Sequence, residues 1–229
     1  MESALTRLRA AWKDGLIVSC QARPGWALHG PGHMAAMAKA AIEGGAVGLR
    51  IELADITAVR QVTTLPIIGL SKRRDLSSAV YITPTFADAQ QIAQAGAQVI
   101  AIDGTSRPRP GGETLEELIW RIHQELGLPV LADVATVSEG CRAAELGADL
   151  IASTLAGYTA QRATTTGPDL ELVRDLVHAL EIPVLAEGRI HTPEQARTAL
   201  DCGALAVVVG AAITNPRFIT EQFVAGLRR

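Results

Sequence analysis

Aromatic residues are scarce in this chain, at 3% of its 229 residues. Few side chains are therefore available as stacking platforms for single-stranded nucleic acids. Cysteine is rarer still: Cys20, Cys141 and Cys202 are odd in number and far apart in the sequence. Such cysteines argue against a disulfide framework and indicate a reducing compartment, so we expect a cytoplasmic location.

The chain also has no excess of either charge and no long apolar run. Its 21 Lys and Arg nearly balance 24 Asp and Glu, for a net charge of −3, which provides no basic surface for nucleic acid. No apolar run approaches the ~20 residues that span a membrane. The charged, amphipathic start MESALTRLRAAWKDG lacks the apolar core of a secretory signal. We therefore expect neither nucleic acid nor a membrane as a partner.

Short apolar runs alternate with amphipathic stretches along the chain. Eight runs rich in Val, Ile, Leu and Ala are typical of buried parallel strands: residues 16–21, 46–52, 66–72, 98–103, 129–133, 149–153, 183–187 and 204–210. Helical spacing lies between them, as in residues 34–46, 86–97, 114–127, 137–148 and 192–204. Many of these stretches close on a Gly-Ala pair, and glycine there supplies the left-handed residue that ends many helices.

A strand–helix unit that repeats eight times predicts an α/β architecture, and the count favours a closed barrel over a large doubly wound sheet. The length suits one barrel, since about 250 residues is typical, and no linker divides the chain. We therefore predict a single-domain (β/α)₈ TIM barrel over residues 1–229. The segment 79–84, AVYITP, could form an extra short strand.

Polar residues close the apolar runs. Because the carboxyl ends of barrel strands meet at one rim, where barrel enzymes build their sites, these residues should gather there. They are Gln21, Arg50, Glu52, Lys72, Asp103, Asp133, Ser153, Thr154 and Glu187, with Gly210 closing the eighth run. Solvated strand ends would account for any one of them, but they explain poorly why long ionisable side chains recur.

Lys72 ends the third run and suits either an imine-forming nucleophile or a base for proton transfer. A lysine pKa of ~10.4 is too high for a base at neutral pH, but burial and nearby cations such as Arg50, Arg73 and Arg74 would lower it. The competing interpretation is a solvated SKRRD turn. Glu187 ends the seventh run, directly before a glycine at which we expect a phosphate to bind. A phosphate would repel a carboxylate that had no function there, so Glu187 suits a role with a sugar hydroxyl or ring oxygen.

The seventh and eighth runs lead into glycines. Gly188 and Arg189 follow Glu187, while Gly210 and Ala211 open a turn before a helical stretch. Loops after these two strands form the usual phosphate site of such barrels, and glycine lets backbone N–H groups approach phosphate oxygens. The sequence therefore favours a phosphorylated ligand.

No motif indicates a metal or a nucleotide cofactor. His29 and His33 have the spacing of two metal ligands, but HGPGH is a Gly/Pro-rich stretch with no Cys or carboxylate within a few residues. The G-x-S-x-G, Walker and G-x-G-x-x-G motifs are also missing. We expect no metal site and no cofactor.

Eight segments between about residues 15 and 215 carry a family resemblance: GLIVSCQA, VGLRIE, PIIGLSKRR, VIAIDGTSRPRP, LADVAT, STLAGYT, LAEGRIHTPEQA and VVVGAAIT. Within them, AIDGT-x-RPRP and AEGR-x-x-TP are the most specific. In these segments and in their order, the chain resembles the N-acylglucosamine-6-phosphate 2-epimerases, also called N-acetylmannosamine-6-phosphate 2-epimerases.

The resemblance implies a (β/α)₈ barrel that converts N-acetylmannosamine 6-phosphate into N-acetylglucosamine 6-phosphate. This step belongs to sialic acid and amino-sugar catabolism and needs neither metal nor nucleotide cofactor. The matched motifs assign the catalytic lysine to Lys72 and the catalytic glutamate to Glu187. They imply substrate contacts at Gln21, Arg50, Asp133 and Tyr158, and phosphate contacts at Gly188, Arg189, Gly210 and Ala211. Arg217 lies just beyond the matched motifs and is a further candidate for the phosphate.

One motif departs from the family pattern. The family usually reads A-I-T-R-P, whereas this chain reads AITNP, so Asn215 stands where an arginine is expected near the phosphate. Arg217 could reach back, although on a helix it would point elsewhere, and the extra arginine of SKRRD, Arg73 or Arg74, could compensate. Barrels of this size often associate, and we expect a homodimer.

Two other functions stay open from the sequence. A phosphosugar aldolase or lyase would use Lys72 to form an imine, which borohydride would trap. A sugar-phosphate-binding barrel without turnover has only the change at Asn215 in its favour. Proton exchange into N-acetylmannosamine 6-phosphate distinguishes the three functions, because the epimerase must exchange the proton at C2.

Overall fold

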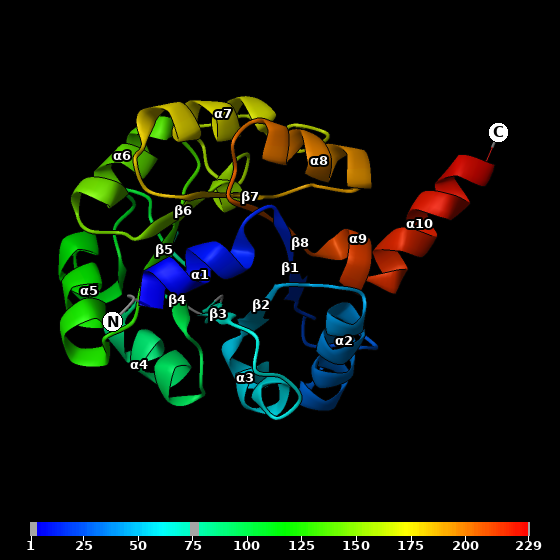
Figure 1. Ribbon diagram of the computed structural model, residues 1–229, viewed down its shortest axis with the longest axis horizontal. Helices are drawn as coiled ribbons and strands as arrows, with labels where there is room; N and C mark the ends of the chain where they lie inside the picture. The colour runs from blue at the N-terminus through cyan, green and yellow to red at the C-terminus, as the bar shows by residue number, and fades with distance from the viewer. Residues whose placement is uncertain (1–3, 74–77, 229) are drawn as a thin grey trace.

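The computed structural model describes residues 4–73 and 78–228, and its centre is a closed barrel of eight parallel strands in chain order (Figure 1). The predicted (β/α)₈ barrel is confirmed. The strands are β1 Gly15–Cys20, β2 Gly48–Glu52, β3 Ile67–Leu70, β4 Val99–Asp103, β5 Val130–Asp133, β6 Leu150–Ala152, β7 Val184–Glu187 and β8 Ala206–Val209. Each lies within a predicted run or begins one residue before it.

Helices follow the strands and form the outer ring of the barrel. They are α2 Pro31–Glu43, α3 Leu53–Arg60, α4 Phe86–Gln94, α5 Leu115–Arg121, α6 Val137–Glu145, α7 Leu170–Ala179 and α8 Pro193–Asp201. A π-helical turn, Ile122–Leu126, continues α5, and 3₁₀ turns occupy Pro110–Gly112 and Ser153–Leu155. Beyond β8 come the short α9 Ala211–Thr214 and then α10 Pro216–Leu227.

Local sequence signals set the ends of these helices. Thr114, Thr136 and Thr192 form capping boxes at the starts of α5, α6 and α8, in which each side chain accepts a backbone N–H of the first turn. The predicted glycines follow the helix ends in the left-handed region, as at Gly45 (φ 97°) and Gly147 (φ 100°). The chain can therefore leave each helix and enter the next strand within a few residues.

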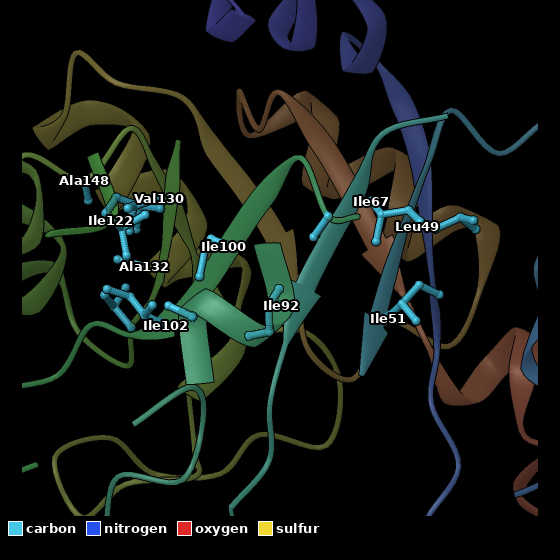
Figure 2. Close-up of a cluster of buried hydrophobic side chains, with 14 of the residues drawn as sticks. Leu49, Ile51, Ile67, Ile92, Ile100, Ile102, Ile122, Val130, Ala132 and Ala148 are labelled. Atoms are coloured by element: carbon cyan, nitrogen blue, oxygen red, sulfur yellow. The ribbon is translucent and has the colours of Figure 1, made fainter. Parts of the chain in front are cut away.

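Side chains of the strands alternate between two apolar layers, because successive residues of a strand point to opposite faces. The inner layer fills the barrel with residues such as Ile68, Leu131 and Leu185. The outer layer packs the strands against the helices, and Figure 2 shows part of it, with Ile100 of β4 near Val130 of β5. Sequence period and barrel geometry therefore agree strand by strand.

The amino-terminal mouth of the barrel is closed by α1, Ala4–Trp12, which lies across it in Figure 1. Trp12 is fully buried and joins the inner apolar layer together with Leu8. A Cβ atom at Gly48, at the start of β2, would lie 2.7 Å from the Trp12 indole nitrogen, so only glycine leaves room for the indole. Apolar packing thus seals this end.

Two segments are not part of the ring of strands and its covering helices. Residues 79–84 do not form a barrel strand; they make an isolated antiparallel bridge between Ile82 and Lys72. Helix α10 extends away from the barrel (Figure 1), and Phe223 and Leu227 on it are 72% and 81% exposed. Among the helices of the described residues, none combines the length and apolar character that crossing a membrane requires.

Candidate active site

An open pocket of about 900 Å³ lies at the carboxyl ends of the strands. Nine of the eleven residues that the sequence predicted for the site line it: Gln21, Arg50, Lys72, Tyr158, Glu187, Gly188, Arg189, Gly210 and Ala211. The two that do not are Asp133 and Arg217. The pocket has the position expected for a barrel enzyme, where strand ends and the following loops build the site.

The strand period explains why these side chains face the pocket. Residues two apart in a strand point to the same face. Leu70 belongs to the inner layer, so Lys72 continues its row, and Leu185 leads in the same way to Glu187. The inward rows are therefore apolar along the barrel and become polar at the rim.

Arg50 is the centre of the pocket floor and is only 1% exposed. Its two terminal nitrogens bind the Asp133 carboxylate at 2.9 and 2.5 Å, and Nη1 also donates to Glu187 Oε2 at 2.6 Å. Burial opposes the charged form of Arg50, but the two carboxylates outweigh it and raise its pKa. Arg50 is therefore a fixed positive charge beneath the pocket.

Asp133 lies beneath Arg50 and is fully buried. Both of its oxygens bind Arg50, and Oδ1 also accepts the hydroxyl proton of Thr154 at 2.6 Å. The carboxylate is thus occupied in holding Arg50, and it contributes no surface to the pocket. A substrate contact at Asp133 would act through the arginine.

Glu187 is 13% exposed at the pocket wall. Burial raises the pKa of its carboxyl above the usual value, and the nearby Asp133 charge adds to the rise, while Arg50 and Lys72 oppose it. Ser153 fixes its backbone, donating its hydroxyl to the Glu187 carbonyl at 2.9 Å and accepting the Glu187 N–H at 3.1 Å. This carboxyl is therefore suited to carrying a proton at a higher pH than an exposed glutamate.

Lys72 faces Gln21 across the pocket wall. Its Nζ donates a hydrogen bond to Gln21 Oε1, and Gln21 Nε2 donates in turn to Ser19 Oγ at 2.7 Å. The amide fixes the place of the Lys72 amino group, and the lysine is close enough to help lower the pKa of Glu187 against the effect of burial. The amine of Lys72 and the carboxyl of Glu187 thus line one pocket. Arg50 lies between the carboxylates of Asp133 and Glu187.

The expected phosphate loops also line the pocket, but Arg189 is directed elsewhere. Gly188 has φ 114°, a backbone geometry that favours glycine, and Arg189 follows at φ 52°. The Arg189 guanidinium donates to the carbonyls of Ala156 (2.9 Å) and Gly167 (3.2 Å). It also lies 5.4 Å from the centre of the Tyr158 ring. Arg189 therefore holds the loop between β6 and α7 beside the pocket.

The segment that carries the family departure begins α10. Asn215 lines the pocket, and its side chain accepts the Phe218 N–H at 3.1 Å. Arg217 does not line the pocket, because its Nε donates to Glu221 Oε1 at 2.8 Å along the exposed face of the helix. The structure gives Arg217 a helix-surface partner, and Arg74 lies outside the described residues.

Several pocket residues were not predicted. His191 lines the pocket, with its ring 5.1 Å from that of Phe218. Arg23, Trp26 and Tyr81 also line it, from loops whose positions no sequence period fixes. In residues 4–73 and 78–228, no group of three His, Cys, Asp or Glu side chains is arranged to hold a metal ion.

Comparisons with known proteins identify the family of the chain. A family model described as "Putative N-acetylmannosamine-6-phosphate epimerase" matches residues 34–229. A relative from Cutibacterium acnes, named "Putative N-acetylmannosamine-6-phosphate 2-epimerase", is 48% identical over the full length of both chains. One of the same name from Thermosynechococcus vestitus is 49% identical over 94% of each. The solved N-acetylmannosamine-6-phosphate 2-epimerase of Clostridium perfringens superimposes with a TM-score of 0.93 at 42% identity, over 96% of both chains. This chain belongs to the N-acetylmannosamine-6-phosphate 2-epimerase family.

Proposed function

We propose that this chain inverts C2 of N-acetylmannosamine 6-phosphate to give N-acetylglucosamine 6-phosphate, with Lys72 as the base at C2. The observation that carries the proposal is that Lys72, Arg50 and Glu187 line one pocket at the barrel rim. The names of the similar proteins support the same substrate class.

The first step in the proposed mechanism opens the sugar ring. The C2 proton becomes acidic only when C1 is a carbonyl, so a proton must leave the C1 hydroxyl and another must reach the ring oxygen. Glu187 is suited to this transfer because its raised pKa favours a proton-carrying carboxyl in the pocket.

The second step moves the C2 proton. The neutral amine of Lys72 takes this proton, and the electron pair of the C–H bond moves toward C1, which leaves negative charge on the C1 oxygen. Arg50 stabilises this enolate from the pocket floor, as a preorganised charge does where charge develops. The Glu187 carboxyl or the newly formed Lys72 ammonium then gives a proton to the opposite face of C2, which completes the inversion, and exchange with water restores the starting protonation of both groups.

We propose that the phosphate binds at the loops after β7 and β8, against Gly188, Gly210 and Ala211. A Cβ atom at Gly210 would meet its nearest neighbour at 3.5 Å and one at Gly188 at 3.8 Å, so backbone can be approached closely at both positions. Asn215, four residues after Ala211, lines the same pocket with a polar side chain. Binding at the far end of the sugar would align C2 with the lysine.

The test is proton exchange in deuterated water, followed by NMR on N-acetylmannosamine 6-phosphate. The wild-type chain should exchange the C2 proton and form the epimer, and Lys72→Met should do neither. Lys39→Met, which changes an exposed lysine of α2, is the matched control and should behave as wild type. Near-normal exchange in a folded Lys72→Met variant would remove the lysine from the mechanism.

We further propose a homodimer in the cytoplasm. The location follows from the three free cysteines, which a reducing compartment would keep as thiols. The dimer follows from the exposed Phe223 and Leu227 of α10, which offer apolar surface that a second copy would cover. Light scattering on the purified protein should give twice the chain mass. Replacing Phe223 and Leu227 by Ser should shift it toward the monomer, and an unchanged mass would contradict a role for α10 in the dimer.

A further inference from the structure

The backbone around Lys72 is held by a second segment, although β3 ends at Leu70. The residue before the lysine, Ser71, exchanges two hydrogen bonds with Thr83: its carbonyl accepts the Thr83 N–H at 2.7 Å, and its N–H donates to Thr83 Oγ1 at 3.1 Å. The residue after it, Arg73, donates its N–H to the Tyr81 carbonyl at 2.9 Å. The lysine thus lies between two anchored neighbours.

Thr83 makes these contacts in an unfavourable conformation. It is fully buried and has φ 41°, a value that β-branched residues rarely adopt. Such strain persists only where the surrounding structure enforces it, and it concentrates at functional sites. Glycine would relieve the strain, but it has no hydroxyl to accept the Ser71 N–H.

Asp88 forms a second anchor for the same two neighbours. This buried residue in the first turn of α4 accepts Ser71 Oγ at 3.3 Å and Arg73 Nη1 at 3.3 Å, both at Oδ1. Its other oxygen accepts the Thr85 hydroxyl at 2.6 Å. Thr83 and Tyr81 therefore hold the backbone on each side of Lys72, and Asp88 holds the side chains of the same two neighbours. The segment 81–88 also bonds to β4, where the Ile82 carbonyl accepts the Asp103 N–H at 3.1 Å.

We infer that Thr83 is a positioning residue for the epimerisation, which it supports by fixing the backbone from which Lys72 reaches the substrate. The inference rests on the proposed role of Lys72 at C2. A lysine side chain has four rotatable carbons, so the place of its amine depends on a fixed backbone as well as on Gln21. Small misplacements of a reacting group reduce turnover strongly, because alignment supplies much of the rate.

The experiment compares three substitutions at one position. Thr83→Val keeps the shape and removes the hydroxyl, Thr83→Gly removes the hydroxyl and relieves the strain, and Thr83→Ser keeps the hydroxyl. Thr114→Val is the matched control: Thr114 also accepts a backbone N–H, from Glu117 at 3.1 Å, but it caps α5 outside the pocket. For each variant, kcat and KM are measured along with hydrogen exchange at the amides of Ser71 and Arg73.

We expect kcat to fall about ten- to a hundredfold in Thr83→Val and Thr83→Gly, with KM changed less than about twofold because the phosphate loops are untouched. Thr83→Ser and Thr114→Val should keep kcat within about threefold. Faster exchange at Ser71 and Arg73 should accompany the loss. Thr83→Gly decides the question if Thr83→Val does not fold.

Normal kcat in Thr83→Gly, or an equal loss in Thr83→Ser, would overturn the inference. Both outcomes are distinct from failure of the proposed function, in which the wild-type chain itself would not exchange the C2 proton. In that event, exchange at the Ser71 and Arg73 amides still reports whether Thr83 holds this backbone, and unchanged protection in Thr83→Gly would reject it.

Discussion

The two mouths of the barrel are built from the same eight strands and are stabilised by different forces. At the amino-terminal mouth, α1 places the buried Trp12 in one apolar cluster with Leu8 and Ile17. At the carboxyl-terminal mouth, the same inward rows end in Arg50, Asp133 and Glu187. The first end is sealed by burial of apolar area, whereas the second keeps charges in a pocket that is open to a ligand.

The buried charges at the carboxyl-terminal mouth are less favourable for stability than the apolar packing at the other end. Two carboxylates and an arginine taken out of water carry a desolvation penalty that their attraction does not reliably repay. An apolar cluster of the same size would hold the mouth at least as well. The buried ions at the open mouth are therefore explained by the reaction proposed for the pocket and not by the needs of the fold.

Removing the central charge of the open mouth should affect both the stability and the turnover of the protein. Arg50→Met leaves Asp133 buried without its partner, so we expect a loss of about 3–5 kcal/mol in the free energy of unfolding and loss of turnover. Urea denaturation and the NMR assay measure the two effects. In Arg50→Met/Asp133→Leu, stability should return without turnover, and returned turnover would contradict a catalytic use of Arg50.

The corresponding change at the closed mouth should affect stability alone. Trp12→Ala removes a fully buried indole, for which we expect a loss of about 3–5 kcal/mol and unchanged kcat in the folded fraction. Trp12→Phe should lose less, because it keeps most of the apolar volume. Trp120→Ala is the control, since that side chain is 60% exposed on α5. A fall in kcat with Trp12→Ala would mean that the two mouths are not independent.

The pH dependence of stability tests the charge balance at the open mouth. The folded pKa of Glu187 is raised above the ordinary 4.5, so the folded state binds the proton more tightly than the unfolded chain. Its contribution is fully present below pH 4.5 and is lost as the pH rises through the raised value. The free energy of unfolding of the wild type, minus that of Glu187→Gln, should therefore be smaller at pH 8 than at pH 5. A difference that changes in the opposite direction would show that attraction to Arg50 outweighs burial.

Thiol modification tests the outer side of the strands at the open mouth. Cys20, at the end of β1, belongs to the outer apolar layer, and burial raises the pKa of its thiol to about 12. At pH 8 iodoacetamide should therefore modify the half-buried Cys141 and Cys202 and leave Cys20 unmodified in the native protein. Mass spectrometry of digests gives the answer. Equal labelling of Cys20 would mean that the reagent reaches the layer between the strands and the helices at this mouth.

Much of the fold and of the pocket could be predicted from the sequence because both follow the period of the strands. Lys72 and Glu187 come two residues after inward-facing leucines, so their place at the rim follows from alternation alone. Burial beneath another side chain leaves no such pattern, and nothing in the sequence predicts that Asp133 serves Arg50. The same is true of Arg189, whose direction is set by a loop more than twenty residues away.

Loop residues were the least predictable. Tyr81 and His191 reach the pocket through turns without a repeating pattern, and the bridge that places residues 79–84 beside Lys72 looks in sequence like one more strand. A positive φ at Thr83 has no sequence signal, because threonine is among the residues that rarely adopt it. Contacts between distant segments, rather than local preference, decide all of these positions.

The helix that crosses the amino-terminal mouth has a practical consequence for handling the protein. A carrier domain or surface joined ahead of α1 would meet the barrel on the face opposite the pocket, whereas one joined after α10 would follow an element whose first residues border it. Attachment through the leading end should therefore leave ligand access unhindered. A tag or a sensor support is therefore best attached at the leading end, because Trp12 fixes α1 at the mouth opposite the pocket.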